Sequence, residues 1–478
     1  MTISERKRER LSAFLGELPV AVAVRLFAAL EGDRARGGRG LPHDAIIEDL
    51  RVQLADRGAM PPKRTPNAKR TFFTPFEDFF VSIRKGRKRQ AQIARTSLDP
   101  IWRVMMTDPS LTEAAMAAAA LDDCYAAGGI AAAGDPAALE RAMFLAAEAG
   151  LGRLCARARD NEDMRESLMA DLGGEATYFD FEEIRYLLEG VEMLRALRVT
   201  VPTNAPSLNE EQYYDLRKLF LSAYDQSPSL GAYLLLALKG RLDAPWRALG
   251  VYYHLARSAD EKLHAARETV MALPESLFEE LEEMARGLER AGAAPLDAQT
   301  AKARIAYFAD YADGLARHAA KAGDNVFVNR IEACRDIAGE AHTRFVEQAL
   351  TNLRNAMPVR HASGSSRLVA PRPDYAKALA PEIIDDACRA AVLLVAAPAD
   401  ARSLGADPGF AQSTASDAAA QAKTYANDLV AEIRAAEGTD RAAAKRLLEQ
   451  TLSIIEPLLK SDEIGLIRDR AAAAAVTV

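Results

Sequence analysis

The sequence has few cysteines, few aromatic residues and no long uninterrupted apolar run. Its four cysteines lie far apart without paired spacing, which is typical of reduced thiols and excludes a disulfide framework or a zinc knuckle. The most apolar runs, 232–238 and 390–399, are far shorter than the roughly 20 residues that a membrane span requires. The apolar stretch 18–30 is interrupted by Arg25, unlike a signal peptide. These absences predict a soluble, cytoplasmic protein.

Short catalytic and cofactor-binding signatures are also missing. The chain has no phosphate-binding glycine loop, dinucleotide fingerprint, nucleophile elbow or zinc deaminase motif. Glu261 and His264 have half of the ligand pattern of a di-iron bundle, but no second copy follows. Trp246 and Tyr253 match the opening of a tetratricopeptide repeat, yet no copy lies about 34 residues away. We therefore expect no cofactor, no metal and no catalytic residue, with an enzyme that uses a helical metal or lipid site as an alternative.

The composition favours helices. Of 478 residues, 49% are hydrophobic but only 6% are aromatic, and alanine dominates, which suits close-packed helices better than sheet. Because single cores stop growing at about 250 to 300 residues, the chain is too long for one core. The sequence predicts an all-α protein with at least two bundle-like helical units.

Several helix ends can be located from capping residues. Thr74-Pro75-Phe76-Glu77 has the form of a capping box, and Asp99, Asp108 and Asp135 each precede a proline at a first helical position. Gly150 is interpreted as a helix stop. Apolar residues at helical spacing predict one helix over about 180–197.

Two stretches later in the chain have heptad spacing. Because each contains only about three repeats, they predict an antiparallel helical hairpin within a bundle. The apolar positions are Ala301, Ile305, Phe308, Ala312, Leu315 and Ala319, then Phe327, Ile331, Cys334, Ala338, Ala341 and Phe345.

A polar stretch rich in glycine, serine and proline follows this hairpin and is the best candidate for a domain boundary. A unit of about four helices is expected after it. We divide the chain into an N-terminal helical region (1–60), a basic, Phe-rich segment (61–95), a main helical domain (96–357), a linker (358–374) and a C-terminal helical bundle (375–478).

Charge is distributed unevenly along the chain. The net charge is −7, but residues 57–95 hold eleven Lys or Arg against only Glu77 and Asp78, a local charge of +9. The rest of the chain therefore carries −16. A local basic stretch on an acidic body can attract an anionic partner over roughly a Debye length of 8 to 10 Å. The candidate anion- or partner-binding residues are Lys63, Arg64, Lys69, Arg70, Arg84, Lys85, Arg87, Lys88 and Arg89.

Phenylalanines accompany these cations. Phe76, Phe79, Phe80 and Ile83 recur at i, i+3, i+4 and i+7, which predicts one apolar stripe on a helix that begins at Pro75. One interpretation is that Phe76, Phe79 and Phe80 make an aromatic contact with a partner. The other places the stripe in the core and the basic runs in solvent.

We expect a non-enzymatic helical adaptor or regulatory scaffold that binds protein partners and contacts an anionic surface through 61–95. The alternative is a nucleic-acid-binding protein that uses the same segment, and an acidic lipid or protein surface would satisfy the same charges.

Overall fold

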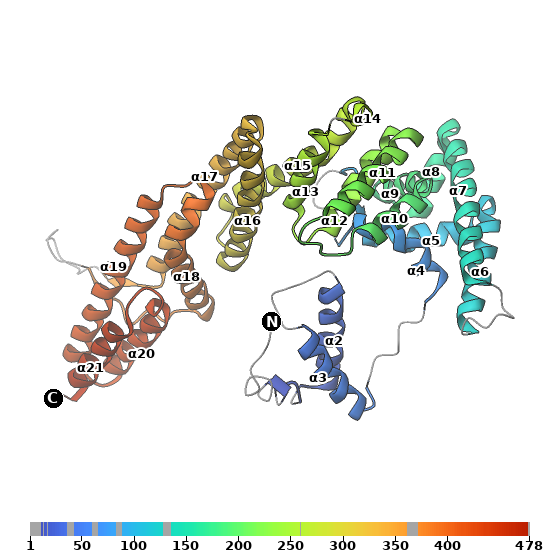
Figure 1. The fold of residues 1–478 in the computed structure, drawn as a ribbon. Helices are drawn as coiled ribbons and strands as arrows, with labels where there is room; N and C mark the ends of the chain where they lie inside the picture. The colour runs from blue at the N-terminus through green and yellow to red at the C-terminus, as the bar shows by residue number, and fades with distance from the viewer. Residues whose placement is uncertain are drawn as a thin grey trace. The chain divides into compact units, whose positions relative to one another are not determined.

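The structure is a computed structural model, and it describes residues 11–12, 14–16, 18–35, 43–59, 66–82, 88–127, 135–258, 260–360 and 371–476. These residues form helices almost exclusively, as the composition predicts (Figure 1). The chain divides into two compact units, Met1–Pro274 and Glu275–Val478. No helix among the described residues combines the length and apolarity that crossing a bilayer demands.

Near the start of unit 1, helices α2 (Val20–Ala35) and α3 (His43–Asp56) form a pair. Their contact buries a small core that includes Phe27 and Leu50. The described residues of the predicted N-terminal helical region, 1–60, are mainly helical.

The described remainder of unit 1 consists mainly of helices of the α and 3-10 types, with two short strands. The helices are α4 (Ala68–Phe73), η1 (Thr74–Phe79), η2 (Arg95–Ser97), α5 (Leu98–Thr107), η3 (Pro109–Leu111), α6 (Thr112–Ala126), α7 (Pro136–Asp160), α8 (Glu162–Leu172), α9 (Glu175–Leu188), α10 (Val191–Thr200), α11 (Glu210–Gln226), α12 (Pro228–Arg241), η5 (Pro245–Arg247), α13 (Ala248–Ala256) and α14 (Glu261–Ala265). Strands β1 (Phe80–Val81) and β2 (Ile93–Ala94) pair in parallel. Helix α6 lies along α7, and α11 lies along α12 (Figure 1).

The helix predicted to start at Pro75 is replaced by a 3-10 turn and a strand. Thr74 does not cap it; its hydroxyl donates to the Arg70 carbonyl 2.7 Å away. The tighter 3-10 winding aligns residues three apart, so Phe76 and Phe79 enter the core together.

The other predicted helix ends have mixed outcomes. Asp108 and Asp135 cap η3 and α7 as expected, by accepting backbone N–H groups. Asp99 lies within the first turn of α5 and bonds Lys69, so its predicted capping role is wrong. The helix predicted over 180–197 is two helices, α9 and α10, separated at Gly190.

Gly150 does not end a helix, because α7 continues through it. A Cβ at this position would lie 2.5 Å from Leu111 Cδ2 and 2.8 Å from the Ser110 carbonyl oxygen. The glycine therefore allows η3 to approach α7 closely. It serves tertiary packing, although in the sequence it resembles a local helix stop.

Helix α15 (Arg267–Gly292) contains the division between the units at Pro274. Proline lacks the N–H that would bond to the preceding turn, so one helical hydrogen bond is missing at this point. Unit 2 continues with helices α16 (Ala298–Ala322), α17 (Asn325–Asn355), α18 (Pro381–Leu404), α19 (Pro408–Ala435), α20 (Gly438–Ile455) and α21 (Ser461–Val476), and with strands β3 (Val359–Arg360) and β4 (Arg372–Pro373).

The predicted helical hairpin is confirmed as α16 and α17. Every heptad position of both helices is buried, and the two helices contact each other. Gly323 ends α16 in a left-handed conformation with φ of 71°, which reverses the chain within a short turn.

The candidate linker 358–374 does not separate the compact units. Helices α17 and α18, on either side of it, make extensive contact with each other inside unit 2. Its ends also pair, because β3 and β4 form an antiparallel ladder in which Val359 faces Pro373. Residues 361–370 lie outside the described part of the chain. Local composition indicated a break, but the helices on both sides share one core.

Candidate binding sites

The phenylalanines of the basic segment are mainly core residues. Phe76 and Phe79 are 0% and 1% exposed, so they have no surface for a partner, and the proposed aromatic contact is wrong for both. Phe76 packs on Phe72, and Phe79 meets the Tyr233 ring edge-on at 6.0 Å. Phe80 is half-buried, and its ring lies 5.5 Å from the guanidinium of Arg95.

The nine candidate cations fall into two groups. Lys69, Arg70, Lys88 and Arg89 are described, whereas the other five lie outside the described residues: Lys63, Arg64, Arg84, Lys85 and Arg87. Lys69 bonds Asp99 of α5, and Lys88 bonds two carboxylates of α9. The described lysines therefore use their charge within unit 1 rather than forming one shared cationic surface.

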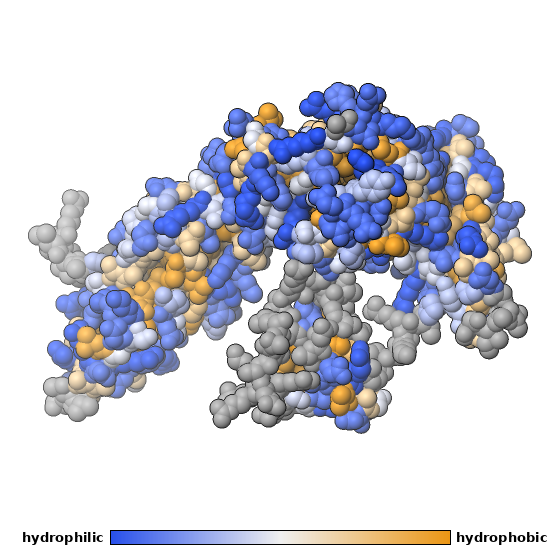
Figure 2. Space-filling view, viewed as in Figure 1, coloured by the Kyte–Doolittle hydropathy of each residue, from blue (hydrophilic) through white to orange (hydrophobic). Residues whose placement is uncertain are grey.

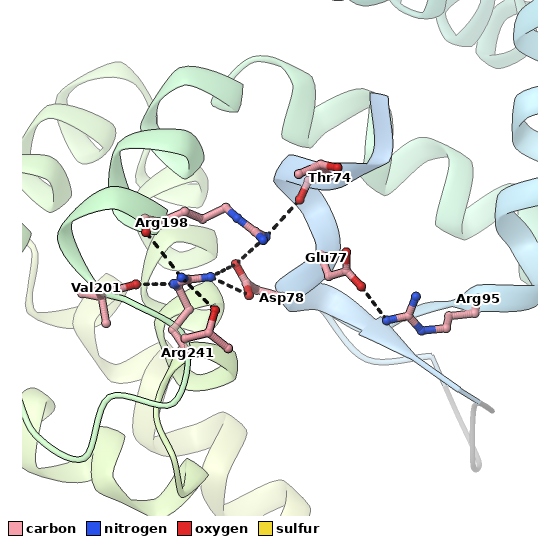
Figure 3. A network of polar contacts seen from close by, with 8 residues as sticks. Thr74, Glu77, Asp78, Arg95, Arg198, Val201 and Arg241 are labelled. Atoms are coloured by element: carbon pink, nitrogen blue, oxygen red, sulfur yellow. Dashed lines mark hydrogen bonds and ion pairs between the residues drawn. The ribbon is translucent and has the colours of Figure 1, made fainter. Parts of the chain in front are cut away.

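The two acids of this segment are each paired with arginine, and Figure 3 shows both pairs. Asp78 accepts from Arg241 of α12 at 3.2 and 3.3 Å and from Arg198 of α10 at 3.1 Å. Glu77 pairs with Arg95 at 2.9 Å. Arg198 also donates to the Thr74 carbonyl at 2.9 Å, so α10 holds both ends of η1 (Figure 3).

The Asp78 and Glu77 ion pairs differ in burial, and therefore in energy. The side chains of Asp78 and Arg241 are 8% and 4% exposed, whereas those of Glu77 and Arg95 are about half exposed. Burial raises the pKa of Asp78 even though both arginines lower it, and burial likewise lowers the pKa of Arg241. A Cβ on Gly240 would lie 2.8 Å from the Asp78 carbonyl oxygen, so this glycine allows α12 to approach η1.

A second buried network attaches the following residues to α9. Lys88 donates to Asp180 at 2.8 Å and bonds Glu183, and both carboxylates are almost fully buried. The N–H of Ala91 donates to Glu183 at 2.7 Å from a left-handed backbone with φ of 61°. The other donors are the Ala94 N–H and the Ser97 hydroxyl to Asp180, and the Tyr233 hydroxyl to Glu183.

Each carboxylate oxygen in this network therefore accepts at least one hydrogen bond, which buried carboxylates require for stability. Together the two networks make the described part of the basic segment a component of the unit 1 core. This structure could not be predicted from sequence, because Lys88 and Glu183 lie 95 residues apart.

Unit 2 contains a groove with a volume of about 560 Å³. One wall is a single face of α19; the other comprises the end of α17 and the β3–β4 hairpin. The lining residues are Arg354, Met357, Val359, Pro371, Pro373, Ala420, Gln421, Thr424, Tyr425 and Asp428. Figure 2 shows hydrophobic residues gathered on one side of unit 2, beside α18.

Polar contacts fix the hairpin wall of this groove. The Tyr425 hydroxyl donates to the Pro358 carbonyl at 2.8 Å. Arg360 and Arg372, one from each strand, reach Glu432 of α19 at 2.7 and 3.7 Å. These contacts attach the hairpin wall to α19, through the lining residue Tyr425 and through Glu432 outside the lining.

A smaller pocket of about 200 Å³ lies in unit 1. Helix α11 contributes Glu210, Tyr213, Tyr214 and Arg217, and the other side is formed by His254, Leu255, Ser258 and Leu263. None of these residues belongs to a motif that the sequence revealed. The spacing i, i+3, i+4 and i+7 on α11 could have revealed their common face, but the sequence does not place His254 beside them.

The alternative metal site at Glu261 and His264 gains no further ligands among the described residues. Both residues are exposed on the short helix α14. The described residues contain no group of three or more His, Cys, Asp or Glu side chains that could hold a metal ion. Comparison with protein families, with curated proteins and with solved structures found no match to this chain.

Proposed function

We propose that this chain is a helical adaptor that binds a short segment of a partner protein in the groove of unit 2. The observation that carries this proposal is the groove itself, which is open along α19 and has a mainly apolar lining between polar ends. Its volume lies in the range of about 300 to 1,000 Å³ that is typical of ligand-binding sites.

The dimensions favour a peptide segment. Ala420 and Asp428 are eight residues apart on α19, so this wall is about 12 Å long at 1.5 Å per residue. That length matches about two helical turns of a partner. Apolar side chains three and four positions apart on an amphipathic helix would enter such a groove.

The charges at the ends predict the orientation of the partner. Arg354 donates to Gln421 at 3.1 Å, and it forms no ion pair with another described residue. Asp428 lies about two turns beyond Gln421 on α19 and forms no ion pair within the described part of the chain. We therefore expect a segment with an acidic residue near Arg354, a basic residue near Asp428 and apolar residues between them.

A peptide-display selection on the full chain tests this proposal. Enriched peptides should combine apolar residues at helical spacing with opposite charges at their two ends. Thr424→Trp, which fills the groove, should abolish their binding. Gln412→Trp places the same ring on another exposed face of α19, about two turns before Ala420, and should leave binding unchanged. Equal binding to both variants, or no enrichment, would rule out the groove as the partner site.

We propose a second role for the basic segment, as a contact for an anionic surface, with nucleic acid as the first candidate. The supporting observation is that the chain on both sides of residues 83–87 is attached to unit 1, by β1 and by the Lys88 network. A fixed base lowers the entropic cost of ordering side chains when a partner binds.

The contacts of Lys88 decide which cations should be replaced in a test of this second role. Lys88 should be left intact because its loss would strand two buried carboxylates. The triple variant Arg84→Gln, Lys85→Gln, Arg87→Gln should weaken binding to duplex DNA in a gel shift and flatten its salt dependence, by about one log–log unit per phosphate contact. Arg286→Gln, Arg290→Gln, Arg344→Gln removes three exposed charges of unit 2 as a control. Absence of any shift at low salt would exclude nucleic acid, and binding to acidic vesicles alone would assign the segment to lipid.

A further inference from the structure

The pocket of unit 1 has a different chemistry from the groove. Glu210, Tyr213, Tyr214 and Arg217 occupy one face of α11 and provide a carboxylate, two phenols and a guanidinium. His254 and Ser258 face them from the end of α13 and the residues after it, and Leu255 and Leu263 supply apolar surface. A pocket of about 200 Å³ is below the usual range for large ligands and suits a small molecule.

One wall of the pocket is aromatic. The rings of Tyr213 and His254 stack with their centroids 4.0 Å apart and their planes at 21°. His254 is itself exposed, so the stacked pair reaches the pocket surface. Burial and the neighbouring Glu210 raise the pKa of Tyr213, which keeps its hydroxyl protonated as a hydrogen-bond donor. The pair therefore presents a flat apolar face with a polar edge, to which a planar ring can stack.

The two charges of the pocket lie at opposite ends of this wall. Glu210 and Arg217 are seven residues apart on α11, or about 10 Å along its axis. Neither forms an ion pair within the described residues, and the described contact of Arg217 is with the Tyr214 ring at 5.5 Å. Arginine is well suited to a phosphate, and a carboxylate to the N–H donors of a heteroaromatic ring.

We propose that this pocket binds a nucleoside monophosphate, whose base stacks on His254 and whose phosphate pairs with Arg217. Glu210 accepts a hydrogen bond from the base at the other end. The long axis of such a ligand, from the base edge to the phosphate, is comparable to the separation of the two charged residues. This site is independent of the groove in unit 2.

Calorimetric titration of the full chain with AMP and CMP tests the proposal, with adenosine, cytidine and inorganic phosphate as separate probes. At least one nucleotide should bind more tightly than either fragment, because only the nucleotide uses both the ring wall and Arg217. Equal binding of phosphate alone, or no binding of either nucleotide at about 1 mM, would overturn the proposal.

Substitutions locate the binding in this pocket. Arg217→Gln should weaken nucleotide affinity about 10- to 100-fold, the usual effect of losing a charged hydrogen bond. His254→Ala should weaken it about 5- to 100-fold through lost stacking, whereas His254→Phe retains a ring and should recover most of the affinity. Arg286→Gln, at an exposed position of unit 2, is the control. Wild-type affinity in Arg217→Gln and His254→Ala would remove the site from this pocket.

Discussion

The two acids of the basic segment provide a sharp test of how that segment is held. Asp78 and Glu77 are neighbours and each bonds arginine, yet only Asp78 is buried with its partner. Replacing Asp78 by Ala leaves Arg241 buried without a counter-charge. Arg241 would retain hydrogen bonds to the Val201 carbonyl and to Thr203, but these neutral acceptors do not balance its charge.

Substitution of Asp78 and of Glu77 should lower the free energy of unfolding by clearly different amounts. Removing one partner of a buried ion pair typically costs about 3 to 5 kcal/mol of unfolding free energy, and we expect Asp78→Ala to lie in this range. Glu77→Ala should cost about 0 to 1 kcal/mol, because an exposed pair is screened by water. The double variant Asp78→Leu, Arg241→Met replaces both charges by apolar side chains and should recover most of the loss.

The chain offers a convenient assay for this comparison. Its two tryptophans, Trp102 and Trp246, both lie in unit 1, so tryptophan fluorescence during urea unfolding reports on that unit alone. Equal unfolding free energies for Asp78→Ala and Glu77→Ala would refute the reasoning. A double variant as unstable as Asp78→Ala would show that shape, rather than the unpaired charge, dominates.

Three further predictions concern buried or strained positions. Burial lowers the pKa of His342 to about 4, so the unfolded state binds a proton that the folded state does not as pH falls from 6.5 toward 4. Acidification from pH 7 to 5 should therefore cost the wild type about 2 kcal/mol more than His342→Leu, as measured by circular dichroism during urea unfolding. Ala91→Gly should stabilise unit 1 by about 0.5 to 1 kcal/mol in urea unfolding, because Ala91 has φ of 61°; Ala94→Gly, at an ordinary extended φ, should destabilise it. Gly240→Ala should lower the stability of unit 1 by about 1 to 3 kcal/mol, because the added Cβ would meet the Asp78 backbone. Gly287→Ala, with open space around it, should raise helix stability by about 1 kcal/mol. Thermal melts compare the two variants.

Features governed by periodicity and local capping could be predicted from the sequence. The heptad positions of α16 and α17 are buried as expected, since a helix places residues three and four apart on one face regardless of its partner. Asp108 and Asp135 cap as expected because a cap needs only its own next few residues. The all-α class follows from the same local preferences.

Features that depend on distant partners could not be predicted. The stripe from Phe76 to Phe80 has helical spacing, but contacts with α10 and α12 hold it as a 3-10 turn followed by a strand. The linker at 358–374 has the composition of a boundary, yet α17 and α18 share a core across it. The groove and the pocket each require side chains from helices whose proximity no local pattern reveals.

The sequence by itself determined that this chain forms helices, which faces of α16 and α17 are apolar, and that positive charge is concentrated early. Only the tertiary structure decided which of those charges are already neutralised, because Lys88 and Asp78 meet partners more than 90 residues away. Helix formation depends on neighbours within one turn, whereas charge pairing and cavities depend on how the helices pack.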